Sequence, residues 1–277
     1  MSKIKTLSNN LFSKRNKALL KELVKTEFKL RYQGSALGYA WSLLKPLGLF
    51  SILYVVFVKF LSVGDAVPHF PVYLLLGIVL WTFFTEATFG ALGSIVGRGD
   101  VIRKIKFPKY IIVISGTINA LINLLFNLTI VMIFAVITGA DFGLRSITAP
   151  LFIIELYLLA LGLGLFLSAL YVKLRDISHI WEVLMQGAFY ATPILYPINI
   201  IIDKFLDKSW IPQILLMNPV AQIIQDLRHV IVTGEAKRTA DIVSSPLNML
   251  PILVVFIILI LGSLYFRKES KYFAEKI

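Results

Sequence analysis

The chain has 277 residues, of which 57% are hydrophobic and only 16% are charged, and its mean hydropathy is +0.80. Soluble domains carry roughly 25% charged residues, so this chain has more apolar surface than one water-soluble core can bury, and lipid must be its solvent. The net charge of +12 does not indicate nucleic-acid binding, because the basic residues gather between apolar stretches, and the absence of cysteine excludes disulfides and thiol chemistry.

The N-terminal part contains an amphipathic pattern. Leu20, Val24, Phe28 and Tyr32 recur at every fourth position, and lysines occupy the other faces. This spacing predicts a basic amphipathic helix that lies at the interface with the inner leaflet. A solvated helix that contacts a soluble partner is the alternative interpretation.

Six apolar stretches have the length of a transmembrane helix, which is about 20 residues. They cover residues 45–63, 70–96, 110–138, 150–172, 177–195 and 247–266. The sequence therefore predicts an all-α integral membrane protein with six transmembrane helices. Its parts are an N-terminal segment (1–44), a transmembrane domain (45–266) and a tail (267–277).

Lysine and arginine counts predict the orientation. The N-terminal segment with Lys45, the loops at 97–109 and 173–175 and the tail together hold 21 of the 28 Lys and Arg residues, whereas the opposite loops hold 6. The basic side of a membrane protein faces the cytoplasm. Both termini are therefore expected in the cytoplasm.

Polar residues inside the predicted spans are candidates for function. Glu86 lies deep in the second span, where it faces either a polar pore or a partner on another helix. Asn119, Asn123 and Asn127 stand four residues apart on one face of the third span. Hydrogen bonding between helices is the simpler interpretation of that face, and a polar strip along a pathway is the alternative.

Residues 193–246 are too apolar for a solvated loop, yet five prolines interrupt them. Within them, Asn218-Pro219 has the pattern of a helix N-cap followed by proline at the first helical position. We therefore expect short re-entrant helices in the outer leaflet between spans five and six, because non-helical backbone at membrane depth must be shielded.

The sequence lacks the motifs of the common enzyme classes. It has no phosphate-binding loop, no G-x-S-x-G elbow and no H-E-x-x-H pair, and its three histidines lie in separate segments. We expect no catalytic residue, no metal site and no cofactor in this chain. Aromatic residues make up 13% of it, but composition does not separate rings that stack on sugars from rings that pack between helices.

Five short patterns occur in order along the chain. They are E-F-K-L-R-Y…S-A-L-G…W…K-P-L over 27–47, V-I-R-K-I-K-F-P over 101–108, R-D-I with T-P-I and Y-P over 175–197, N-P with D-L-R over 218–228, and F-A-E over 273–275. In this order they resemble the membrane subunits of ABC exporters for lipid-linked polysaccharides. That family comprises the O-antigen, capsule and teichoic-acid export permeases.

The resemblance implies the transmembrane subunit of an ATP-driven exporter that moves a polyprenyl-(pyro)phosphate-linked polysaccharide across the bacterial cytoplasmic membrane. Two copies would form the pathway, and two separate ATP-binding subunits would bind ATP and magnesium, so this chain is not an enzyme alone. The expected partners are those subunits, the glycan and membrane lipid, and no nucleic acid. The alternatives are an integral membrane glycosyl- or acyltransferase acting on polyprenyl-linked sugars, and an ABC efflux permease for lipids or drugs.

The resemblance also implies roles for groups of residues. Candidates for the phosphate of the head group are Arg31, Tyr32, Arg98, Arg103 and Lys104. Candidates for the glycan channel are Tyr54, Phe57, Phe83, Phe84, Glu86, Asn119, Asn123, Asn127, Phe189 and Tyr190. Candidates for coupling to the ATPase are Lys106, Phe107, Pro108, Arg175 and Asp176. Candidates for the outer gate are Pro193, Tyr196, Pro197, Asn218 and Pro219.

Overall fold

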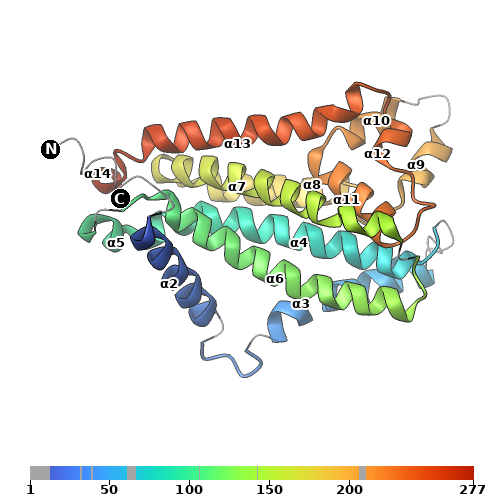
Figure 1. Ribbon diagram of the computed structural model, residues 1–277, viewed down its shortest axis with the longest axis horizontal. Coiled ribbons are helices and arrows are strands. Elements are labelled where there is room, and N and C mark those ends of the chain that lie inside the picture. The colour runs from blue at the N-terminus through green and yellow to red at the C-terminus, as the bar shows by residue number, and fades with distance from the viewer. Residues whose placement is uncertain are drawn as a thin grey trace.

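The computed structural model describes residues 13–31, 33–38, 40–60, 67–105, 107–141, 143–205 and 210–277, and in these it contains helices and no strand (Figure 1). Five of these helices are long and apolar enough to cross a membrane. They are α3 with the π-helical η1 (Ala40–Phe60), α4 (Phe70–Ser94), α6 (Tyr110–Ile137), η4 with α7 (Leu144–Lys173), and η5 with α13 (Leu247–Glu269). The predicted all-α membrane fold is therefore confirmed for the described residues, with five such helices.

The central helix is α4. Of its 18 most apolar consecutive residues 78% are buried, whereas the same measure is 22% in α13 and 11% in α3 with η1. It packs against α3, α6 and α7. A helix that is apolar on all sides needs cover on all sides, and Leu74, Leu76, Ile78, Leu80 and Ala87 are accordingly all fully buried.

Glycines bring α7 and α13 into backbone contact, and the two helices lie side by side (Figure 1). A Cβ placed on Gly162 would lie 2.7 Å from Cα of Leu259. A Cβ placed on Gly262 would lie 2.2 Å from the carbonyl oxygen of Gly162. Small residues at the interface allow this close approach, which is the usual way for membrane helices to gain packing contacts.

The predicted fifth span is shorter than expected. Its helix, α8, covers Ile177–Ala191, and the backbone of Thr192 is extended, with φ −87° and ψ 137°. Pro193 is the cause, because proline disfavours the helical conformation of the residue before it. A helix of 15 residues is about 22 Å long, whereas the hydrocarbon layer is about 30 Å thick. By its own length α8 therefore falls short of a span.

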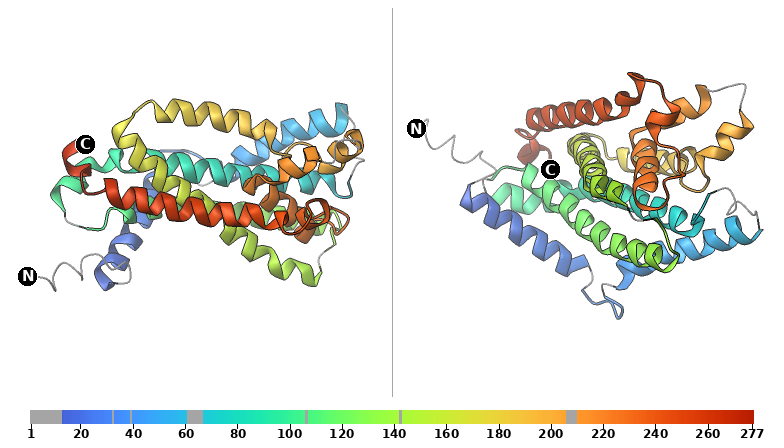
Figure 2. Two further views of the ribbon diagram at one scale, coloured as in Figure 1. Left: turned by 90° about the horizontal axis from the view of Figure 1, so that it is seen from above. Right: turned by 45° about the vertical axis from the view of Figure 1, so that its right-hand side comes forward.

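Residues 193–246 contain short helices, as their prolines indicate. These are α9 (Ile198–Lys204), α10 (Trp210–Leu216), α11 (Pro219–Ile231) and α12 (Thr239–Ile242). They gather at one end of the bundle (Figure 2). The side-chain oxygen Oδ1 of Asn218 accepts a hydrogen bond from the backbone N–H of Val220 at 3.0 Å, which confirms the predicted N-cap of α11.

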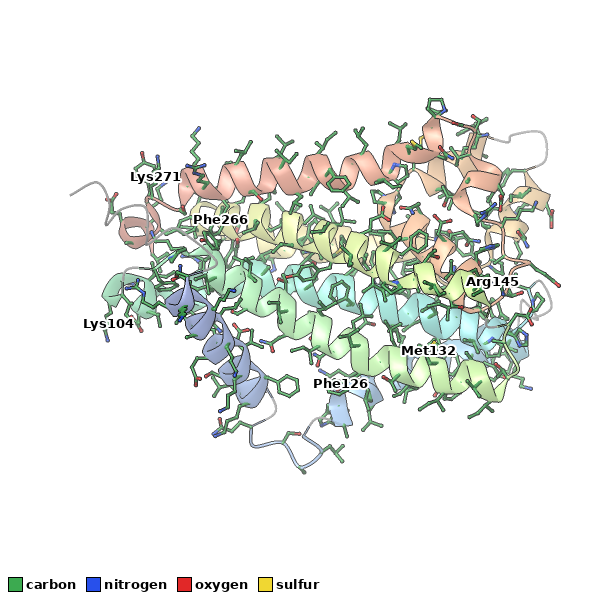
Figure 3. All side chains as sticks on the ribbon, in the orientation of Figure 1. Lys104, Phe126, Met132, Arg145, Phe266 and Lys271 are labelled. Carbon is green, nitrogen blue, oxygen red and sulfur yellow. The ribbon has the colours of Figure 1, made fainter. Side chains whose placement is uncertain are left out.

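The opposite end of the bundle carries α2 (Lys14–Arg31), α5 (Gly99–Lys104) and α14 (Phe273–Lys276). The predicted amphipathic segment is helical, as α2, and packs against α6. Figure 3 shows Lys104 and Lys271 at this end and Arg145 at the other. The charge asymmetry in the sequence thus follows the long axis of the bundle.

Candidate functional site

A cleft of about 590 Å³ opens between α3, α4 and α6, beside the turn that joins α2 to α3. Two aromatic rings, hydroxyl groups, a carboxylate, an amide and an ammonium group share its wall. Aromatic faces stack on sugar rings, and hydroxyl and amide groups hydrogen-bond to sugar hydroxyls. The lining residues are Ser35, Trp41, Ser42, Lys45, Pro46, Thr82, Thr85, Glu86, Phe89 and Asn123.

The polar side of the cleft is built by α4 and α6. The amide Nδ2 of Asn123 donates to Oε1 of Glu86 at 2.8 Å. On the same side of α4, the hydroxyls of Thr82 and Thr85 donate to carbonyl oxygens of their own helix at 2.7 Å and 3.0 Å. A hydroxyl that has donated its hydrogen keeps its lone pairs, so these threonines present acceptors to a ligand.

The three asparagines of α6 reach three different helices. Besides the bond of Asn123 to α4, the amide of Asn119 donates to Oε2 of Glu27 in α2 at 2.6 Å, and the amide of Asn127 donates to the carbonyl oxygen of Ser42 in α3 at 3.2 Å. Hydrogen bonding between helices is therefore confirmed for this face. Asn123 also lines the cleft, while a channel role for any of the three stays a prediction.

The contact of Asn127 compensates a proline. Pro46 lies inside α3 and has no N–H to give to the carbonyl of Ser42, four residues earlier. The amide of Asn127 fills that position. Backbone groups freed at membrane depth need such a partner, so Pro46 and Asn127 act as a pair in the wall of the cleft.

Arg98, a predicted phosphate ligand, is engaged by an acidic side chain. It lies in η3 (Val96–Arg98), forms an ion pair with Glu27 of α2 and donates to Oγ of Ser115 at 3.3 Å. The hydroxyl of Ser115 in turn donates to Oε1 of Glu27 at 3.2 Å. Arg98 thus anchors α2 to the bundle, and a phosphate-binding role for it stays a prediction.

The other predicted phosphate ligands lie apart from the cleft or outside the description. Arg103 donates to the main-chain oxygen of Ile277 at 3.0 Å, and Lys104 is exposed on α5. The side chain of Arg31 and all of Tyr32 lie outside the described residues, and so does Lys106, which was predicted as a coupling residue.

The predicted channel aromatics differ in their surroundings. Phe83 and Phe84 are 2% and 3% exposed, so within one copy of the chain they belong to the core around α4. Tyr190, in contrast, is 69% exposed on α8. Three further rings pack half-buried against the core: Tyr54, Phe57 and Phe189.

The predicted coupling residues lie at the basic end of the bundle. Phe107 is half-buried and Pro108 is buried, and both lie just before α6. The guanidinium of Arg175 lies 5.1 Å from the ring centroid of Tyr171, and Asp176 is exposed in the turn between α7 and α8.

A buried arginine organises the predicted outer gate. Arg228 of α11 is fully buried and donates to the carbonyl oxygens of Tyr73, Pro193 and Ile194 at 3.1, 2.5 and 2.7 Å. Its guanidinium also lies 3.7 Å from the ring centroid of Tyr73. A Cβ on Gly77 would lie 2.5 Å from Nη2 of Arg228, so the glycine makes room for the arginine.

Arg228 therefore joins α4, α11 and the break after α8. Around it, Nδ2 of Asn218 donates to Oγ1 of Thr192 at 3.3 Å, and the hydroxyl of Tyr196 donates to the carbonyl oxygen of Tyr190 at 3.2 Å. The sequence patterns included Arg228 but gave it no role.

Sequence reasoning also missed most of the cleft, since only Glu86 and Asn123 of its lining were predicted as site residues. Trp41 and Lys45 lie in a pattern that carried the family resemblance, yet neither was selected as a site residue. Thr82 and Thr85 stand three residues apart before Glu86, a spacing that places all three on one side of α4. That spacing was the available signal.

Comparison with known proteins shows the family to which this chain belongs. Residues 18–232 match the family described as ABC-2 type transporter. The chain is 28% identical to an O-antigen export system permease protein RfbA of Myxococcus xanthus, over 94% of this chain and 96% of that protein. It is 29% identical to an RfbA of Klebsiella pneumoniae over 78% and 81%, and 23% identical to the polysialic acid transport protein KpsM of Escherichia coli over 79% and 83%. The chain belongs to the ABC-2 type transporter family of membrane permeases.

Proposed function

We propose that this chain is the membrane subunit of an ATP-driven exporter that carries a polyprenyl-(pyro)phosphate-linked polysaccharide across the bacterial cytoplasmic membrane. The names of the relatives, which refer to O-antigen export and polysialic acid transport, support the substrate class. The observation that carries the proposal at residue level is the cleft, because it combines the groups that bind an amphipathic, phosphate-bearing sugar.

Within the cleft, different residues suit the phosphate and the sugar of such a ligand. Lys45 is exposed and supplies a positive charge for a phosphate oxygen. Trp41 and Phe89 are 43% and 37% exposed and offer faces for sugar rings. Glu86 and Asn123 accept from and donate to sugar hydroxyls.

We infer six membrane crossings with both termini in the cytoplasm. The helix α7 ends at the basic end of the bundle, and α13 begins at the opposite end and returns (Figure 1). The chain between them must cross once, and α8 together with the residues after Thr192 supplies that crossing. The short helices α9 to α12 then lie toward the outer surface, with α11 re-entrant.

We propose that two copies enclose the pathway and that one face of α8 lines it. His179, Glu182 and Gln186 are exposed along one side of this helix. Counted from the first residue of α8, Gln186 lies about 13 Å along the helix and Glu182 about 7 Å, so both side chains lie at membrane depth. Carboxylate and amide groups at that depth are costly against lipid and are normally directed into a protein or water-filled interior.

Cysteine labelling tests that face, because the chain has no native cysteine. A Gln186→Cys variant should react with a membrane-impermeant maleimide. A Leu261→Cys variant on α13, where the leucine is 59% exposed, is the control for a lipid-facing position and should not react. Equal labelling at both positions would contradict the assignment of α8.

The ATP-binding subunits are expected to dock at the basic end, on α5 and on the exposed turn at Arg175 and Asp176. ATP and magnesium would be bound by those subunits. Export is tested by reconstituting the complex in vesicles with a lipid-linked glycan and measuring ATP-dependent transfer of the glycan.

Two tryptophan variants connect that assay to the cleft. Trp41→Ala should reduce export while the complex still assembles and hydrolyses ATP. Trp210→Ala, at a 56% exposed position on α10, is the matched control and should leave export unchanged. Absence of ATP-dependent glycan transfer by the native complex would refute the proposed function, and turnover of a polyprenyl-linked sugar by the chain alone would favour a membrane transferase instead.

A further inference from the structure

The end of α13 carries a buried acid at the basic end of the bundle. Glu269 is 6% exposed, and its Oε1 lies 2.8 Å from Nζ of Lys173, the last residue of α7. Its second oxygen lies 3.6 Å from Nζ of Lys276 in α14. A carboxylate is buried in this way only when it is paired, so Glu269 fixes the end of α13 to the end of α7.

The next residues hold the other basic loop. Nζ of Lys109, the residue before α6, donates to the carbonyl oxygen of Ser270 and lies 5.6 Å from the ring centroid of Phe273. Phe273 is 1% exposed and meets Phe266 edge-on at a centroid distance of 5.3 Å. The ring therefore anchors α14 between α13 and the start of α6.

A third contact reaches α5. Arg103 donates to the main-chain oxygen of Ile277 at 3.0 Å. A Cβ placed on Gly99 would lie 2.5 Å from Cγ2 of Ile277, so the glycine lets the tail lie directly on the first turn of α5. The residues 266–277, here called the tail clasp, thus contact the segment 97–109 at both of its ends.

The segments joined by the tail clasp are the two that carry the candidate ATPase contacts. One is 97–109, and the other is the turn that begins at Lys173 and includes Arg175 and Asp176. They lie far apart in sequence, and the tail clasp contacts both. Glu269, Ser270 and Phe273 make the contacts that connect the two segments.

We infer that the tail clasp ties these two segments into one rigid unit, with Glu269 as the positioning residue, so that a stroke received by either segment moves both. This inference rests on the proposed function in one respect, namely that a separate ATPase subunit supplies the stroke. The joining of the segments itself is a property of the chain alone.

The first test uses the full chain without its partners. Glu269→Gln keeps the shape of the side chain and removes the charge that holds Lys173. We expect faster amide hydrogen exchange in both 173–177 and 99–105. The first segment loses its ion pair with Glu269 directly, and the second is then held by a tail clasp that is no longer fixed to α7. Lys276→Ala, which removes the longer and more exposed of the two ion pairs, is the control and should leave both unchanged. Faster exchange in only one segment, or in neither, would overturn the inference.

The second test uses the complex with its ATPase subunit. Glu269→Gln should keep ATP hydrolysis but lose most of the glycan exported per ATP. The charge exchange Lys173→Glu with Glu269→Lys should restore export per ATP, which a merely disturbed fold would not allow. Wild-type export per ATP in Glu269→Gln would contradict the inference.

A cross-link covers the case in which Glu269→Gln does not fold. Gly99→Cys combined with Ile277→Cys places two thiols at an existing contact. If the tail clasp moves as one unit, the oxidised complex exports as well as the reduced one. Loss of export on oxidation and its recovery on reduction would show that the tail clasp opens in each cycle, and would refute the inference. If the native complex exported nothing, the proposed function would fail, while the exchange result would stand by itself.

Discussion

Replacement of Arg228 by lysine tests how the outer segment is held. The native guanidinium donates to three carbonyl oxygens that lie on α4 and on the break after α8. Lysine keeps the charge but concentrates its donors on one atom. We expect Arg228→Lys to keep one of the three bonds and to leave two buried carbonyls without this donor.

The magnitude follows from the contacts. A hydrogen bond from a charged group contributes about 1.5–3 kcal/mol, so the loss of two lowers the free energy of unfolding by about 3–6 kcal/mol. That is a large part of the roughly 5–15 kcal/mol that stabilises a typical folded protein. The variant should therefore unfold at a clearly lower denaturant concentration.

The assay is equilibrium unfolding of the purified chain in detergent micelles by titration with a denaturing detergent. Arg238→Lys is the matched control, because Arg238 pairs with Asp241 at 3.0 Å while its side chain is 55% exposed. Exposed pairs contribute about 0–1 kcal/mol, so this control should be close to the native chain. If both variants lost the same stability, the buried hydrogen bonds of Arg228 would not stabilise the outer segment as reasoned.

Three further predictions concern other parts of the chain. Gly262→Val should destabilise the bundle by more than the 1–3 kcal/mol that is roughly typical of overpacking, because its Cβ meets backbone at 2.2 Å; thermal unfolding in micelles measures this, with Gly187→Val as the open-space control. Asn127→Leu should destabilise the bundle by about 1–3 kcal/mol, because it removes the hydrogen bond from the Asn127 amide to the carbonyl of Ser42. In Asn127→Leu with Pro46→Ala most of that loss should be recovered. The Arg238 side chain lowers the pKa of Asp241. This pair therefore stabilises the fold above the ordinary pKa of an aspartate, and the stabilisation is lost as the pH falls through the lowered pKa. Asp241→Asn should remove this dependence of the unfolding free energy on acid pH and leave its pH dependence elsewhere unchanged.

Local patterns were sufficient where neighbouring residues decide the structure. The four-residue spacing in 20–32 predicts a helix that the structure has as α2, and the Asn218-Pro219 pattern predicts the N-cap of α11. The spacing of the asparagines placed them on one face of α6. It did not show which helices they reach, because those partners lie between 37 and 92 residues away in sequence.

The fifth span shows where counting apolar residues fails. The apolar stretch continues to Leu195, but the helix ends at Ala191 because Pro193 forces Thr192 out of the helical conformation. Hydropathy measures whether a side chain tolerates lipid, and it contains no information on the backbone. The cleft was missed for a related reason, since its wall is assembled from α3, α4 and α6, and only packing brings Trp41 and Lys45 to Glu86.

The prolines inside α3 and after α8 are compensated in the same way. At Pro46 a carbonyl loses its helical partner and an amide from α6 donates to it, and at Pro193 a guanidinium from α11 donates to the two carbonyls beyond the end of α8. In both cases the donor comes from another helix, so each irregularity also fixes a helix contact. The first borders the cleft and the second borders the outer segment. In both places a polar side chain from a distant part of the sequence donates to carbonyl oxygens beside a proline.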